Sequence, residues 1–179
     1  MAFVPEERLG HGAVPDMSLT DNTLLSGSGS GGLVQRGFID TTAAALFASS
    51  IVAAFDVRTA GIDHAARSLS GGNLQKFVVG REILRSPSVL VVAQPTWGVD
   101  AGASVAIHAA LQELAESGCA IVVISQDLDE LMLLSDRISV ISHGRLTAPV
   151  PVGAVTIESI GRAMGGTAGA APAKEPAHA

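Results

Sequence analysis

The sequence predicts an α/β fold in which parallel core strands lie beside a helical subdomain. Two continuous apolar runs, Val89–Val92 and Ala120–Ser125, are typical of strands buried in a parallel sheet. The segment between them, Ala101–Ser117, has a helical pattern and ends at Gly118. Strand, helix and strand in this order form a βαβ unit, so we expect the two strands to be parallel. The chain has 179 residues, of which 47% are hydrophobic, and this is enough for one domain with a core.

Local signals predict the remaining elements. Ser70-Gly71-Gly72 is typical of the start of a helix, and Pro87 indicates that this helix ends just before it. Around His143-Gly144 the pattern is that of a hairpin, with strands over Arg137–Ser142 and Arg145–Thr147. Further helices are expected over Asp40–Phe55, Asn73–Arg85 and Asp127–Leu134.

Composition divides the chain into five segments. The expected order is an apolar start with a charged turn (1–25), a Gly/Ser linker (26–32), the helical subdomain (33–88), the core α/β part (89–165) and an Ala/Pro-rich tail expected to be disordered (166–179).

Charge and hydropathy exclude several classes of partner. The net charge is −6 and the only lysines are Lys76 and Lys174, which argues against a nucleic-acid surface. The most apolar window, Thr41–Phe55, is shorter than the roughly 20 residues of a membrane-spanning helix, so we expect no direct membrane insertion. Cys119 is the single cysteine and excludes an intrachain disulfide; its apolar surroundings predict a core position.

No metal site is expected from the residue spacing. The carboxylates Asp127, Asp129 and Glu130 follow a strand and open a helix, where acidic side chains favour the helix dipole. The histidines lack the paired spacing of metal ligands: His11, His64, His108, His143 and His178.

The most informative segment is Leu69–Lys76, LSGGNLQK. The first turn of a helix presents unpaired N–H groups, and two glycines let an anion approach the backbone closely. Ser70 adds a hydroxyl donor. Two interpretations remain open from these residues alone: an ordinary helix N-cap with a tight turn, or an anion-binding turn.

Three segments together resemble the ATP-binding cassette (ABC) family of transport ATPases. LSGGNLQK is similar to the family's signature motif, VLVVAQPTWGVD (89–100) to its Walker B strand and D-loop, and IVVISQDLDEL (121–131) to its switch region. Glu6-Glu7-Arg8, within FVPEER, resembles a loop of the second cassette in simple-sugar and nucleoside importers. The similarity extends from about Phe3 to about Met164 and implies part of a P-loop-type nucleotide-binding domain, the C-terminal part of a degenerate second cassette.

The resemblance implies roles for individual residues. In the family the signature motif contacts ATP held by another cassette; here that set is Ser70, Gly71, Gly72, Asn73 and Gln75. Gly98 and Asp100 occupy the D-loop and interface positions, although Asp100 also suits an N-cap for the next helix. Glu6, Glu7 and Arg8 are candidates for contact with a membrane subunit, or simply an exposed charged turn. Trp97 is expected to pack on its own loop, with contact to a partner as the alternative.

Departures from the family predict weak hydrolysis chemistry. The phosphate-binding pattern GxxxxGK[ST] is absent from the 179 residues, which contain no Gly-Lys pair, and this suggests a truncated or split gene product. Ala93 and Gln94 stand at the Walker B Asp and Glu positions, and Gln126 at the switch histidine position. Ala93 offers no oxygen to Mg²⁺, and Gln94 cannot accept a proton as a carboxylate does. We therefore expect no hydrolysis by this chain alone and no intact catalytic residue.

The function implied by the resemblance is that of an ATP-binding component of a nucleoside or simple-sugar importer. The chain would supply the signature half of a composite site for ATP with Mg²⁺ and would hold neither alone. Its partners would be another cassette and membrane permease subunits, which would attach it to the cytoplasmic face of the plasma membrane. The alternatives are a non-hydrolysing regulatory or interaction module and a truncated remnant that pairs with another cassette.

Overall fold

The computed structural model describes residues 1–27, 29 and 32–165. The chain divides into two compact units, Met1–Asp127 and Leu128–Ala179. The expected disordered tail, 166–179, lies outside the described residues. The elements of the first unit are β1 (Ala2–Val4), α1 (Leu19–Gly27), β2 (Val34–Gln35), β3 (Phe38–Ile39), α2 (Thr41–Ala54), the 3-10 turn η1 (Ala66–Ser68), α3 (Gly71–Ile83), β4 (Val89–Ala93), α4 (Ala101–Glu116) and β5 (Ala120–Ile124).

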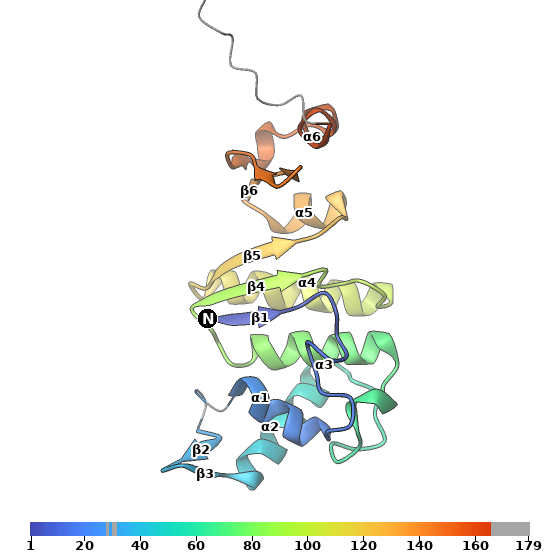
Figure 1. Cartoon of the computed structure of the whole chain (residues 1–179), viewed down its shortest axis with the longest axis vertical. Helices are drawn as coiled ribbons and strands as arrows, with labels where there is room; N and C mark the ends of the chain where they lie inside the picture. Colours follow the sequence, from blue (N-terminus) through green and yellow to red (C-terminus); the bar gives the residue numbers. More distant parts are fainter. Residues whose placement is uncertain (28, 30–31, 166–179) are drawn as a thin grey trace, which may run out of the picture. The chain divides into compact units, whose positions relative to one another are not determined.

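A parallel three-stranded sheet forms the centre of the first unit. The strand order is β1-β4-β5, and both pairs are parallel, as Figure 1 shows. The predicted βαβ unit is therefore confirmed, with α4 as its crossover helix. The register pairs Val4 with Val92 and Val92 with Val123, so these three side chains share one face of the sheet.

The two faces of this sheet differ in burial. Helix α3 packs against β1, β4 and α4, and α4 also packs against β5. On one face Val4, Leu90 and Val92 are fully buried, while Ile121 and Val123 of β5 are partly buried. On the opposite face Phe3, Val122 and Ile124 are 52%, 53% and 51% exposed. The expectation that Ala120–Ser125 is a buried strand was wrong. An apolar run shows that the residues are hydrophobic, but it does not show which face of the sheet the helices of this unit cover.

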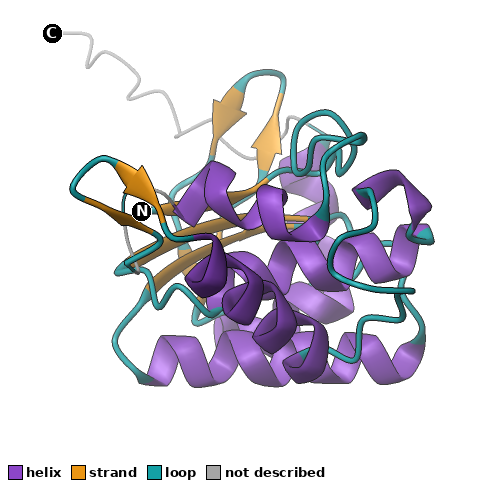
Figure 2. Cartoon of the chain, turned by 90° about the horizontal axis from the view of Figure 1, so that it is seen from below, coloured by secondary structure: helices purple, strands orange, loops and turns teal. Residues whose placement is uncertain are grey.

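A helical layer packs beside α3. Helix α2 contacts α1 and α3, and α1 and α2 lie nearest the viewer in Figure 2. Asp40 caps α2 through a 2.9 Å hydrogen bond from the Ala43 N–H to its carboxylate. The helix predicted over Asp40–Phe55 is thus confirmed, with Asp40 as its N-cap. Helix α1 was not predicted, and its last residues, Ser26 and Gly27, fall within the segment expected to be a linker.

Buried polar groups hold the N-terminal segment onto α3. Arg81 donates to the Gly12 carbonyl oxygen at 2.8 Å and to the Asn22 carbonyl oxygen at 3.0 Å, while Glu82 accepts from Arg81 Nε at 2.8 Å. The Asn22 amide is itself buried and bonds four backbone groups, including the Val14 N–H and carbonyl oxygen. These bonds offset the cost of burying polar groups and fix residues 12–22 against the helix.

The second unit contains short elements over its described residues. Two antiparallel pairs form, β6 with β9 and β7 with β8, and the second is the predicted hairpin around His143-Gly144, shorter than expected. Thr156 and Ser159 form a reciprocal capping box at the start of α6, and the Ser142 hydroxyl donates to the Met164 carbonyl oxygen. The elements are α5 (Leu128–Leu134), β6 (Arg137–Ile138), β7 (Ile141–Ser142), β8 (Arg145–Leu146), β9 (Val150–Pro151), η2 (Val152–Ala154) and α6 (Ile157–Met164).

Candidate ATP-facing turn

The Ser70–Gly72 turn opens helix α3 at the surface. The helix begins at Gly71, earlier than the predicted start at Asn73, and Ser70 is its N-cap. Ser70 Oγ accepts hydrogen bonds from the Asn73 N–H at 3.4 Å and from Asn73 Nδ2 at 2.9 Å. A hydroxyl that accepts two hydrogen bonds still has its own proton to donate. The turn combines this hydroxyl donor with the positive end of the helix dipole. Because Ser70 and Gly71 are exposed, a molecule at the surface can reach both.

Asn73 holds this serine in place. Its amide is half-buried and uses both polar atoms within the chain: Nδ2 donates to Ser70 Oγ, and Oδ1 accepts from the Arg58 N–H at 2.9 Å. The resemblance placed Asn73 among residues that contact ATP. In the structure its side chain bonds the residues around the turn, and so orients the Ser70 hydroxyl.

The turn lies directly against the loop that ends β4. A Cβ atom added to Gly72 would lie 3.1 Å from the Gly98 carbonyl oxygen, so the two backbones are in close contact. Gly98 has a φ of +66°, a conformation that glycine adopts without strain. The structure therefore brings together two segments that resemble different motifs of the ABC family.

Arg8 completes this junction from the N-terminal segment. Its Nη1 donates to the Gly71 carbonyl oxygen at 3.2 Å, and its Nη2 donates to the Trp97 carbonyl oxygen. Glu6 and Glu7 are exposed, and Glu7 pairs with His11 at 2.9 Å. The three residues proposed as one charged contact loop thus have different surroundings. No local sequence signal distinguishes Arg8 from its neighbours, because its partners are far away in the chain.

Gln75 differs from its predicted role in nucleotide contact. Its side chain is 1% exposed, and Nε2 donates to the Gln94 carbonyl oxygen at 3.0 Å and the Pro95 carbonyl oxygen at 2.8 Å. A buried amide pointing into its own chain does not reach a ligand held by another molecule. Gln75 instead joins α3 to the end of β4.

The end of β4 does not suit a divalent cation. Ala93 has no ligand atom, and Gln94, at the neighbouring position, is buried with a φ of +50°. Among the described residues, no group of three or more His, Cys, Asp or Glu side chains could hold a metal ion. Mg²⁺ prefers several oxygen ligands, so these residues do not fit it, and Gln126, which is exposed, adds no carboxylate.

Asp100 caps helix α4. Its carboxylate accepts from the Ala103 N–H at 3.0 Å, and this bond lowers the pKa of the Asp100 carboxyl below its ordinary value. The side chain lies at the surface. The N-cap role considered from the sequence is therefore present in the structure.

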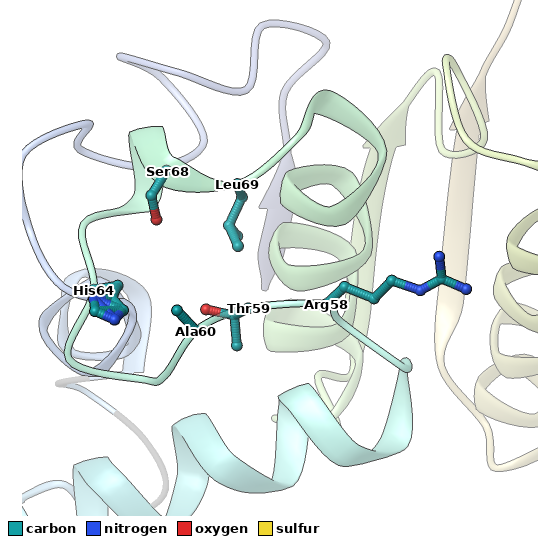
Figure 3. A pocket seen from close by; sticks show the side chains of 6 residues that line it. All are labelled: Arg58, Thr59, Ala60, His64, Ser68 and Leu69. Carbon is teal, nitrogen blue, oxygen red and sulfur yellow. The ribbon is translucent and has the colours of Figure 1, made fainter.

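A pocket adjoins the turn on its N-terminal side, shown in Figure 3. The Arg58 side chain extends away from the other labelled residues, so its guanidinium does not point into the pocket. The lining residues are Arg58, Thr59, Ala60, His64, Ser68 and Leu69.

Two further residues differ in exposure. Trp97 is 66% exposed, so its ring does not pack into the loop as expected from the sequence. Cys119 is buried, as expected, and burial raises the pKa of its thiol.

Within the described part of the chain, no helix has both the length and the apolar character needed to cross a membrane.

Sequence comparison finds relatives over most of the chain. It is 39% identical to the guanosine import ATP-binding protein NupO of Bacillus subtilis over 167 residues, and 40% identical to the nucleoside import ATP-binding protein NupA of Lactococcus lactis over 166 residues. A ribose import ATP-binding protein of Streptomyces avermitilis is 38% identical over 170 residues. These alignments cover 93–95% of this chain but 33% of each relative, so the chain spans about a third of their length. No protein-family model matches.

Structural comparison supports the fold. The chain is similar to the dimeric ATP-binding cassette MJ0796 in a post-hydrolysis state bound to ADP and Pi, with a TM-score of 0.68 and 20% identity. A second dimeric structure of MJ0796, described as a bacterial ABC transporter cassette, gives a TM-score of 0.69 and 18% identity. Each match covers 84% of this chain and 62% of the solved chain. The expected α/β cassette fold is therefore confirmed.

Proposed function

We propose, from the premise that this chain belongs to the ATP-binding cassette family, that it is an ATP-binding component of a nucleoside or ribose-type sugar importer. In this proposal the Ser70–Gly72 turn contacts the terminal phosphate of an ATP molecule held by another cassette. The relatives' names supply the substrate class, and the geometry of the turn supplies the mode of contact.

The exposed turn is the observation that carries the proposal. The Ser70 hydroxyl and the first N–H groups of α3 lie at a surface, where a second molecule can reach them. Backbone N–H groups at a helix start are donors for phosphate oxygens, and the helix dipole adds to the attraction. The turn is held in place by Asn73, Arg8 and the Gly98 loop, so the entropy cost of ordering it when phosphate binds is small.

The same residues support a division of labour between two cassettes. The 179 residues contain no Gly-Lys pair, and Ala93 and Gln94 provide neither a cation ligand nor a carboxylate base. We therefore assign the binding of ATP and Mg²⁺, and the hydrolysis of ATP, to the partner cassette. This chain provides the donors that close over the terminal phosphate.

Permease subunits are the second class of partner in this proposal. The exposed carboxylates Glu6 and Glu7 lie in the segment that leads to Arg8, which itself contacts the turn. A membrane subunit that binds this loop would be connected to the ATP-facing turn through one residue. The chain would then act at the cytoplasmic face of the membrane through its partners.

The proposal is tested by photolabelling in the chain's native membranes. ATP carrying a photoreactive group on its γ-phosphate is expected to label residues 69–76 of this chain, with ATP as competitor and mass spectrometry as the readout. Ser70→Arg is expected to abolish the label, because the larger cationic side chain fills the surface of the turn. Ser68→Arg, two residues away in η1, is the matched control and should retain it.

Label that is absent from 69–76, or that survives Ser70→Arg, would overturn the contact. ATP hydrolysis by the purified chain, proportional to its concentration, would overturn the division of labour. Measuring solute uptake distinguishes the interaction-module alternative from the importer component. A regulatory chain would be photolabelled together with its partner cassette, but its removal would leave solute uptake intact.

A further inference from the structure

Arg8 joins three segments that lie far apart in the sequence. One guanidinium nitrogen donates to the carbonyl oxygen of Gly71, in the first turn of α3, and another to that of Trp97, in the loop after β4. The fork of a guanidinium is suited to this task, because its donors are fixed in one plane and can serve two acceptors at once.

The space around the guanidinium is closely matched to it. A Cβ atom added to Gly71 would lie 3.2 Å from Arg8 Nη1, and one added to Gly98 would lie 3.4 Å from Nη2. Glycine at both positions therefore lets the guanidinium approach the two backbones. Arg8 Nε is buried with no hydrogen-bond partner among the described residues, so the two terminal nitrogens carry the contacts.

The position of Arg8 also has an electrostatic consequence. Partial burial lowers the pKa of the guanidinium, but the group keeps its positive charge at neutral pH. That charge is hydrogen-bonded to the Gly71 carbonyl oxygen, in the first turn of α3, and so lies near the positive end of the helix dipole. An anionic group that approaches Ser70 from the surface would be attracted by both.

We propose that Arg8 is a positioning residue that locks the Ser70–Gly72 turn against the Trp97–Gly98 loop and connects both to the Glu6–Glu7 segment. The lock is a property of this chain alone. Its consequence for ATP contact rests on the function proposed above, and the two are tested separately.

Trp97 provides a direct readout of the lock. It is the single tryptophan, the chain has no tyrosine, and its carbonyl oxygen accepts from Arg8. In the purified full chain, Arg8→Lys keeps the charge, but one ammonium cannot bridge both carbonyl oxygens with the geometry of the fork. We expect a shift in Trp97 emission and greater quenching by iodide. Amide exchange in 71–76 and 96–99 should become about tenfold faster, as expected for loss of a hydrogen bond to a charged donor.

Arg58→Lys is the matched control. Arg58 is also bonded to the segment around the turn, but through its backbone N–H, which donates to Asn73, and its side chain extends away from the other residues labelled in Figure 3. This variant should leave Trp97 emission and exchange unchanged. Arg8→Met is the second test variant, since it removes both donors while retaining much of the side-chain length. Circular dichroism shows which variants are folded. If Arg8→Met does not fold, the comparison of Arg8→Lys with Arg58→Lys tests the lock.

The lock is overturned if Arg8→Lys has the emission and exchange of Arg58→Lys. If the lock is present, Arg8→Lys should also reduce γ-phosphate photolabelling of 69–76 in membranes. Retained labelling with altered Trp97 emission would confirm the lock but reject its role at ATP. Absent labelling of the unsubstituted chain would reject the proposed function without affecting the lock.

Discussion

Gln75 donates from its buried side chain to the carbonyl oxygen of Gln94, over a distance of 3.0 Å. This bond and its companion to Pro95 tie the first turns of α3 to the end of β4. It fixes the distance between the helix that starts at the exposed turn and the loop that continues to Trp97. A residue expected to contact nucleotide is thus part of the support beneath the turn.

Gln75→Leu is expected to destabilise the chain. The substitution fills a similar volume but leaves the carbonyl oxygens of Gln94 and Pro95 without this buried donor, at a cost of about 1–3 kcal/mol. Urea unfolding followed by circular dichroism measures the change. Gln112→Leu, on the exposed side of α4, is the control and should change the free energy of unfolding by less than about 0.5 kcal/mol. Equal effects would show that the Gln75 bonds contribute nothing specific.

Gly80→Ala is expected to destabilise the chain although alanine favours helices. A Cβ atom at this position would lie 2.5 Å from Cδ2 of the buried Phe55 ring, so the ring must move. Overpacking of this kind costs about 1–3 kcal/mol. The double variant Gly80→Ala/Phe55→Leu should recover part of the loss, and thermal unfolding of the three proteins tests this. If Gly80→Ala alone raises the melting temperature, the close packing of α3 on Phe55 is refuted.

Asp100→Ala is expected to lower the melting temperature at neutral pH. Because the folded pKa of Asp100 is lowered, the ionised carboxylate stabilises the fold above the ordinary carboxyl pKa. This stabilisation is lost as the pH falls through the lowered pKa. The difference between Asp100→Ala and the unsubstituted chain should therefore shrink on acidification. Asp63→Ala, at an exposed loop position, is the control, and a pH-independent difference for Asp100→Ala would contradict the carboxylate cap.

The two faces of the central sheet should respond differently to the same substitution. Val92 is fully buried and Val122 is 53% exposed, so Val92→Thr should cost about 1–3 kcal/mol while Val122→Thr costs less than about 0.5 kcal/mol. Chemical unfolding of both variants measures this difference. A large cost for Val122→Thr in the purified chain would mean that the exposed face is covered in solution.

Helix α1 shows why part of the fold was not predicted. Leu19–Gly27 contains several polar residues and leads into a Gly/Ser-rich stretch, which together indicate a turn region. In the structure Asn22 and Thr23 are fully buried, with their side chains bonded to backbone groups. Periodicity of apolar residues cannot identify a helix whose buried face contains polar side chains satisfied by its neighbours.

Local chemistry in the sequence predicted the turn that opens α3, the N-cap of α4 and the parallel pairing of the two core strands. A serine or aspartate before a helix caps it through its own side chain, and a helix between two apolar strands imposes a crossover; both effects act over short stretches of chain. The tertiary structure alone decided that Gln75 faces inward, that Arg8 meets Gly71 and Trp97, and that one sheet face is exposed. These arrangements depend on which distant segments pack together, because a hydrogen bond between residues 8 and 97 forms only after the sheet and α3 have brought them into contact.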